Sequence, residues 1–325
     1  MTLALHGKSK TRQGWLIAIA VAMVAFAALA GAGALFGGGD ARATGTGMYS
    51  SIPAALPGNV VSLGFEATQA KEFGDRVSFV AGSGSKLDSV TVVLSSWGCE
   101  AGAWYTGNCA TTPGATFSHP ITLNLYQAGG TTPGALIVTQ TQTFAIPYRP
   151  SADTVKCTGA NAGKWYSTAD LACYNGLATK VTFHFPNPGL AVPTSLVWGV
   201  AFNTSTSGYS VIGTGTACAA TSAGCGYDSL NVGAESLALV GTDVDPNGAF
   251  YNSVAAGNYC DPGAGGTGIF RLDDGCWAGY RPMAEFAAAT SPTDKDQCKK
   301  DGWMTFNSPS FPDQGTCVSY VNNHN

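Results

Sequence analysis

Ten cysteines in five close couples constrain the folding of this 325-residue chain more than any other feature of its sequence. Within each couple the two cysteines are closer together than either is to the next couple. In a chain that enters an oxidising compartment, an even number of cysteines at such spacings predicts disulfides. Each local disulfide stabilises the fold by roughly 2–3 kcal/mol in the chain-entropy description. The predicted pairs are Cys99–Cys109, Cys157–Cys173, Cys218–Cys225, Cys260–Cys276 and Cys298–Cys317.

Metal binding is the alternative use of so many cysteines. Structural zinc sites use Cys-x2–4-Cys pairs with matching partners. None of the five couples has that spacing, and after residue 43 the chain has only His119, His184 and His324 to offer as further ligands. The spacings therefore favour disulfides.

The N-terminal segment indicates that the chain is exported. Three basic residues between positions 8 and 12 precede an uncharged apolar run over 15–36, and a small-x-small sequence follows at 41–43. This order is typical of a secretory signal peptide that is cleaved before Thr44. The apolar run is also just long enough for an uncleaved membrane anchor. Both interpretations place the rest of the chain outside the cell or at the cell surface.

The charge of the exported part argues against polyanionic partners. Residues 1–43 contain four bases and one acid, so the remainder has 12 bases and 19 acids, a net charge of −7. Such a chain is not expected to bind nucleic acid or an anionic membrane surface. Contact with a membrane is expected only through the N-terminal segment, if that segment is not cleaved.

Short β-branched or alternating runs between the cysteine couples predict strands. Turn residues separate them, as in the sequence GGTTPG at 129–134. No amphipathic helix of convincing length follows residue 44. We therefore predict an all-β fold, an antiparallel β-sandwich of jelly-roll-like type with disulfide-stapled loops and a small C-terminal module. The clearest predicted strands are 89–97, 121–127, 135–146, 181–185 and 195–203.

The sequence predicts that the C-terminal part is a separate module. The sequence AAATSPT at 287–293 has the composition of a spacer, and the residues after it contain their own cysteine couple and aromatic side chains. So small a unit needs a disulfide, because its core is too small to hold it alone. The predicted domains are a signal peptide or anchor at 1–43, a β-sandwich at 44–286, the spacer at 287–293 and a Cys-bounded module at 294–325.

Several strings in the chain carry a resemblance to known proteins: EFGDRVSF, LDSVTVVLSSWGC, ATFSHPITLNLYQ, TQTFAIPYRPS and YDSLNVG. In these the chain resembles a family of exported β-sandwich proteins of actinobacteria. The tail, CKKDGWMTF…FPDQGTCVSYV, is similar to a small Cys-bounded module found on other exported bacterial proteins. The resemblance covers most of residues 64–321. It implies location and fold, and it transfers no catalytic residues.

Aromatic residues gather in and beside the predicted cysteine loops, and they are the candidate ligand-binding residues. Flat rings on rigid loops stack on the apolar faces of sugars. The alternative is that these rings fill space around the disulfides. The residues concerned are Trp104, Tyr105, Trp165, Tyr166 and Trp277.

The sequence GTDVDPNG places Asp243, Asp245 and Asn247 at alternating positions before a glycine. Oxygen ligands at this spacing resemble the start of a calcium loop. The twelfth position is Val254 rather than glutamate, so the EF-hand pattern fails, and a polar turn is the alternative. A structural calcium ion is therefore the single cofactor that the sequence suggests.

No catalytic residue is assigned from the sequence. The chain has no Gly-x-Ser-x-Gly elbow and no His-Glu-x-x-His motif, and Glu100 is the carboxylate nearest a candidate aromatic platform. The sequence favours a non-catalytic surface or secreted protein, with a glycan or cell-wall polymer as the candidate partner. The alternatives are a secreted glycan-acting hydrolase and a purely structural envelope protein.

Overall fold

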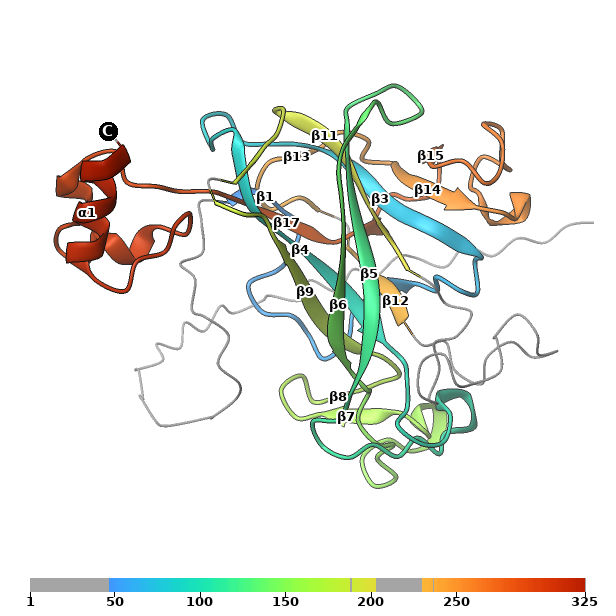
Figure 1. The fold of residues 1–325 in the computed structure, drawn as a ribbon. Coiled ribbons are helices and arrows are strands. Elements are labelled where there is room, and N and C mark those ends of the chain that lie inside the picture. Colours follow the sequence, from blue (N-terminus) through green and yellow to red (C-terminus); the bar gives the residue numbers. More distant parts are fainter. Residues whose placement is uncertain (1–46, 188, 203–229, 236, 325) are drawn as a thin grey trace, which may run out of the picture. The chain divides into compact units, whose positions relative to one another are not determined.

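Two antiparallel β-sheets form the framework of the part of the chain that the structure describes. This computed structural model describes residues 47–187, 189–202, 230–235 and 237–324 (Figure 1). The predicted signal segment and the Cys218–Cys225 couple lie outside these ranges.

The first sheet is built around β4, which has strands paired along both of its edges. In the described residues its strands are β1 (Gly47–Ser50), β2 (Ser62–Leu63), β4 (Lys86–Ser96), β9 (Leu177–His184), β10 (Leu190–Ala191), β12 (Leu230–Glu235), β16 (Arg281–Pro282) and β17 (Ala284–Ala288).

The second sheet has the strand order β15-β14-β3-β11-β5-β6, with β13 paired to β3. A separate short hairpin pairs β7 with β8 inside a cysteine loop. The strands are β3 (Ala70–Ser78), β5 (Thr116–Gln127), β6 (Leu136–Pro147), β11 (Ser195–Ala201), β13 (Thr242–Asp243), β14 (Gly248–Ser253) and β15 (Arg271–Asp274), with β7 (Trp165–Ser167) and β8 (Ala172–Tyr174) in the hairpin.

The five clearest strand predictions each correspond to a strand of the structure, namely β4, β5, β6, β9 and β11. The predicted turn at 129–134 joins β5 and β6 as a hairpin. Its closing bond runs from the amide of Gly134 to the carbonyl of Gln127 at 2.9 Å. Alternating apolar residues and Gly/Pro turns were sufficient to predict these strands and this turn, because both signals act within a few residues.

The inner faces of the two sheets contribute to one hydrophobic core. Trp198 of β11 contacts Phe286 of β17 across the sheets, with ring centroids 6.2 Å apart. Phe144 of β6 meets Phe183 of β9 edge to face at 5.0 Å. The predicted all-β antiparallel class is therefore confirmed, whereas the jelly-roll order of the strands stays a prediction.

Four of the five predicted disulfides are present, and each closes the loop that its spacing predicted. No free cysteine occurs among the residues described. The fifth couple lies outside the described ranges. The four observed bonds are Cys99–Cys109, Cys157–Cys173, Cys260–Cys276 and Cys298–Cys317.

The C-terminal module has its own small core of Cys298, Phe306, Phe311, Cys317 and Val321. It contains the α-helix α1 (Gln314–His324), which the sequence pattern did not predict. The helix starts where the Asp313 carboxylate accepts the amide of Thr316 at 2.7 Å, an N-terminal cap that follows a proline-containing loop. In the described part of the chain, no helix is long and apolar enough to cross a bilayer.

The predicted spacer at 287–293 is partly structured. Strand β17 extends to Ala288, and the fully buried Asn307 of the module is bonded to the segment that follows. Its Nδ2 donates to the carbonyl of Ala288 at 2.9 Å, and its Oδ1 accepts the amide of Thr290 at 2.6 Å. A side chain of the module thus fixes the start of the spacer.

Replacing Asn307 with alanine should detach this start. The substitution leaves the buried carbonyl of Ala288 and the half-buried amide of Thr290 without these partners, which costs about 1–3 kcal/mol. Hydrogen exchange at Thr290 should become at least tenfold faster, and the spacer should become sensitive to protease. Asn322→Ala, at an exposed position of α1, is the matched control. Equal exchange rates in the two variants would contradict the proposed role of Asn307.

Candidate functional site

The aromatic residues predicted to bind a ligand do not form a flat platform. Trp165 and Trp277 are buried, at 7% and 4% exposure. Trp165 donates its indole N–H to the carbonyl of Gly176 at 2.7 Å, so its ring is fixed inside the loop. Neither of these two rings faces solvent.

The other three predicted rings have exposed surface but differ in orientation. Tyr105 is 58% exposed, and its ring is nearly perpendicular to that of Trp104, with an interplanar angle of 77°. Tyr166 is half-buried in the second stapled loop, which the Cys157–Cys173 disulfide closes, and the ammonium of Lys156 is 5.9 Å from its ring centre. Coplanar stacking on one sugar ring is therefore not available to Trp104 and Tyr105 together.

The carboxylates of the predicted calcium loop are paired with arginines. Oδ2 of Asp243 is 2.6 Å from Nε of Arg281, and the carboxylate of Asp245 accepts two hydrogen bonds from Arg76. Asn247 contributes its backbone carbonyl to the turn before Trp277. In the part of the chain that the structure describes, no group of three or more His, Cys, Asp or Glu side chains could hold a metal ion. The calcium prediction receives no support from this geometry.

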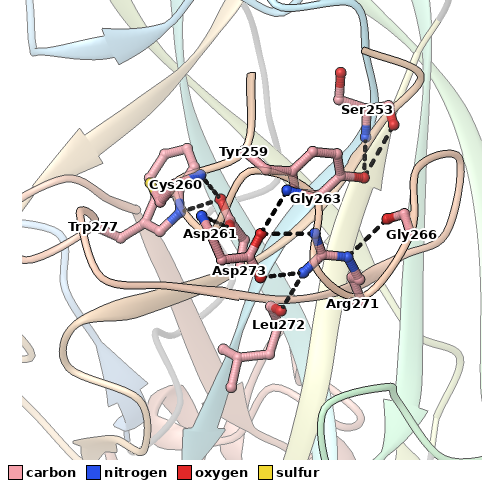
Figure 2. Close-up of polar contacts among 10 residues, drawn as sticks. All are labelled: Ser253, Tyr259, Cys260, Asp261, Gly263, Gly266, Arg271, Leu272, Asp273 and Trp277. Atoms are coloured by element: carbon pink, nitrogen blue, oxygen red, sulfur yellow. Dashed lines mark hydrogen bonds and ion pairs between the residues drawn. The ribbon is translucent and has the colours of Figure 1, made fainter. Parts of the chain in front are cut away.

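A second acidic cluster surrounds Arg271 (Figure 2). The guanidinium bonds both carboxylate oxygens of Asp261, at 2.7 and 2.9 Å. These bonds lower the pKa of Asp261 to about 2. Asp273 accepts the amides of Cys260 and Asp261 and the indole N–H of Trp277, at 2.9, 3.1 and 2.8 Å. Burial nevertheless raises the pKa of Asp273. The carboxylates of Asp261 and Asp273 accept hydrogen bonds from groups of the same segment. The network therefore holds the loop between β14 and β15 in place.

The outer face of the second sheet carries a different kind of cluster. In β3 the inward-facing residues Phe73 and Val77 alternate with outward-facing ones, and Glu72 lies on the outer face. The cross-strand register places Asn252 of β14 directly opposite Glu72. Along the other edge of β3, Gly74 of β3 lies directly opposite Gly199 of β11.

Gly199 leaves the space in which the Glu72 carboxyl lies, and Gly74 allows the backbone of β11 to approach closely. A Cβ on Gly199 would be 2.6 Å from Oε1 of Glu72 and 2.8 Å from the ring of Phe270. A Cβ on Gly74 would be 1.7 Å from the carbonyl oxygen of Trp198. Any larger residue at these positions would displace either the carboxyl or the backbone.

The Glu72 carboxyl is held by two neutral donors on β5. Nδ2 of Asn124 donates to Oε1 at 2.9 Å, and the hydroxyl of Tyr126 donates to the same oxygen at 3.0 Å. Burial raises the pKa of Glu72, and the two hydrogen bonds oppose this rise. Burial, and next the Glu72 charge, also raise the pKa of Tyr126, which therefore stays a donor at neutral pH.

One unpartnered acceptor and a pair of hydroxyl groups lie on the same face of the sheet as this carboxyl. The side-chain oxygen Oδ1 of Asn252 is buried and has no hydrogen-bond partner. The hydroxyls of Thr122 and Thr141 lie 2.8 Å apart and continue the polar strip towards the sheet edge. The ring of Phe270 is tilted against that of Tyr126, with centroids 5.7 Å apart. We call Glu72, Asn124, Tyr126, Asn252 and Phe270 the outer-face site.

Chemically, the outer-face site has buried acceptor capacity that suits a ligand that donates hydrogen bonds. Both bonds that Glu72 accepts come from uncharged groups, so the carboxyl retains capacity for a ligand hydroxyl. Glu100, the glutamate first considered for catalysis, lies elsewhere in the first stapled loop. Its exposed carboxylate accepts the amide of Thr112 at 2.5 Å, and this bond lowers its pKa. The site thus resembles a binding site more than an acid–base pair.

Sequence reasoning did not single out Glu72, Asn124, Tyr126, Asn252 or Phe270 as a site. The signal that was available is Gly199 inside the predicted strand 195–203, since a glycine inside a strand often marks a close approach of backbone or ligand. Comparisons with protein-family models, with curated proteins and with solved structures found no match to this chain.

Proposed function

We propose that this protein is an exported, non-catalytic binding protein of the cell surface or the medium, with a jelly-roll-like β-sandwich that binds a carbohydrate at the outer-face site. The observation that carries the proposal is the Glu72 carboxyl, held by Asn124 and Tyr126 beside the unpartnered oxygen of Asn252. Sugars present arrays of hydroxyl donors, and carboxylate and amide oxygens are the acceptors that bind them.

Two further observations support the location and the ligand class. The four disulfides are typical of a protein in an oxidising compartment. On the outer face, the aromatic ring of Tyr126 lies beside the polar acceptors, which is the combination of an apolar surface with fixed polar groups that small ligand sites use.

Substitution of Glu72 and Tyr126 should abolish most of the binding. A panel of soluble glycans and cell-wall polysaccharides would first be screened with the wild-type protein, and the strongest ligand would be measured by calorimetry. Glu72→Gln and Tyr126→Phe should each raise Kd by roughly 10–100-fold, because each removes or weakens a hydrogen bond worth about 1.5–3 kcal/mol.

The matched control lies on the other sheet. Thr91 of β4 and Thr182 of β9 form a cross-strand hydroxyl pair at 2.9 Å, the counterpart of the Thr122–Thr141 pair. Thr141→Val should weaken binding, whereas Thr182→Val should not. A lack of any glycan ligand, or equal effects of the two threonine variants, would refute the proposal. Release of shortened glycan during the same incubations would instead indicate a hydrolase.

A further inference from the structure

Arg149 is a buried cation without an acidic partner. The described ranges contain four arginines, and three of them pair with an aspartate: Arg76 with Asp245, Arg271 with Asp261, and Arg281 with Asp243, each at 2.6 to 2.7 Å. Arg149 has no such partner and is fully buried. It follows β6, and its amide donates to the carbonyl of Gly98, directly before the first stapled loop.

The hydrogen bonds of this guanidinium are few and go to neutral groups. Nη2 donates to the carbonyl of Gly163 at 2.8 Å, and Nε is 3.4 Å from the carbonyl of Pro150. Nη1 is buried and has no partner. Burial lowers the pKa of Arg149 to about 10, so the group is still a cation at neutral pH.

Leaving a charge buried and unpaired is costly, so natural proteins almost always pair it or use it. The planar fork of a guanidinium matches carboxylates, phosphates and sulfates, to which it donates two parallel hydrogen bonds. Arg149, with its unpartnered Nη1, therefore retains the hydrogen-bonding capacity that an oxyanion requires.

A second unpartnered donor belongs to the same loop junction. The indole Nε1 of Trp104 is buried and has no hydrogen-bond partner, although the ring is partly exposed. The carbonyl of Trp104 accepts the amide of Gly107, and Gly107 packs against Gly163, whose carbonyl holds Arg149. The first and second stapled loops, 99–109 and 157–173, thus meet over the guanidinium.

The contact between the two loops beside Arg149 is made by two glycines. Gly107 and Gly163 are both half-exposed and both have positive φ, at 69° and 83°. A Cβ on Gly163 would be 2.5 Å from Cα of Gly107, so the close contact depends on the absence of side chains.

We propose that Arg149 and the indole N–H of Trp104 form an oxyanion-binding site at the junction of loops 99–109 and 157–173. Its ligand is a carboxylate, as on an acidic sugar, or a tetrahedral anion such as phosphate or sulfate. This site is separate from the outer-face site and does not depend on the function proposed for Glu72.

The test is a titration of the wild-type protein followed by the indole N–H signals in nuclear magnetic resonance. Sodium glucuronate, inorganic phosphate and sulfate would each be added at constant ionic strength, with chloride as the reference. The Trp104 signal should shift saturably with at least one of the three, with Kd at about 1 mM or below. Trp198 is the internal control, because its Nε1 is also buried and unpartnered but lies in the core between the sheets.

Two arginine variants complete the experiment. Arg149→Met should weaken anion binding at least tenfold and, without anion, should leave the melting temperature unchanged or raise it, because it removes an unpaired buried charge. Arg281→Met, which deprives Asp243 of its partner, should lower the melting temperature and leave the Trp104 titration unchanged.

The outcomes separate clearly. A response to glucuronate alone identifies a carboxylate ligand, and a response to phosphate or sulfate identifies a tetrahedral anion; both support the site. No saturable shift with any of the three, or the same shift in Arg149→Met, overturns it. If Arg149→Met does not fold, the wild-type titration still decides, and Trp104→Phe, followed through the backbone amide signals of Gly107 and Gly163, should bind the anion more weakly because the phenyl ring lacks the donor. Glu72→Gln should leave all of these titrations unchanged.

Discussion

Asp273→Ala should lower the free energy of unfolding by about 3–5 kcal/mol, the range seen when one partner of a buried charged network is removed. Asp273 is fully buried and accepts three hydrogen bonds, from the amides of Cys260 and Asp261 and from the indole of Trp277 (Figure 2). Alanine leaves all three donors without an acceptor, and each unsatisfied buried donor carries a desolvation cost of its own.

The measurement is chemical denaturation of the two proteins at pH 7, with the Cys260–Cys276 disulfide confirmed in both. Asp274→Ala is the matched control, because Asp274 is the next residue of β15 and is exposed. That variant should change the free energy of unfolding by less than about 0.5 kcal/mol. An equal loss of unfolding free energy in the two variants would contradict a stabilising role of the hydrogen bonds to Asp273.

The same substitution has an expected functional effect. Phe270 directly precedes β15, and its ring covers Gly199 beside Glu72. A loosened loop would release this ring, so the affinity of the outer-face site for its glycan should fall even where Asp273→Ala remains folded. Intact binding in the folded variant would show that Phe270 is not part of the site.

Asp75→Asn should stabilise the protein at pH 7, by about 1 kcal/mol or more, because it removes a buried negative charge that the fold disfavours. Asp75 lies on the inner face of β3 and is fully buried opposite Trp198. Its Oδ1 accepts the amide of Arg76 at 2.8 Å, whereas Oδ2 is buried and has no partner. Asparagine retains the first bond and removes the charge.

The pH dependence follows from the direction of the pKa shift. Burial, followed by the charge of Asp243, raises the pKa of Asp75 well above its ordinary value of 3.8, and the charge of Arg281 opposes this only in part. The native state then binds a proton more tightly than the unfolded state. The stabilisation is fully present below pH 3.8 and is lost as the pH rises through the raised pKa.

Wild-type stability should therefore fall as the pH rises above about 4, and Asp75→Asn should reduce this slope. Denaturation curves at pH 4, 5, 6, 7 and 8 would measure it. A smaller slope should remain, because burial also raises the pKa of Asp243. Asp274→Asn should leave the wild-type slope intact, and an unchanged slope in Asp75→Asn would contradict the assignment.

The outer-face site shows why sequence reasoning located the strands but not the site. Glu72, Asn124 and Asn252 come from three strands that are distant in sequence, and the register of β14, β3, β11 and β5 brings them to one face. Register is set by packing across the whole sheet, so a shift of one residue would move each side chain to the other face. The aromatic loops attracted attention because their residues are adjacent in sequence, and the fold buries Trp165 and Trp277.

The ion-pair partners of the arginines could not be predicted from local sequence either. Arg76 and Asp245 are 169 residues apart, and nothing local to either residue indicates that they meet. The pairing of Arg76 and Arg281 with aspartates occupies the predicted calcium ligands, whereas Arg149, alone among the four arginines that the structure describes, has no carboxylate partner. Which cation is satisfied and which is free is a property of the assembled sheets.

By itself, the sequence determined the all-β class, the principal strands, the β5–β6 hairpin and the four observed disulfides, because alternation, turn residues and short cysteine loops act over a few residues. Only the tertiary structure decided that Glu72 is held beside Asn252, that Asp75 is buried as an acid in the core, and that Arg149 lacks a partner. These features depend on strand register and on contacts between distant segments, and neither is encoded in any local stretch of the chain.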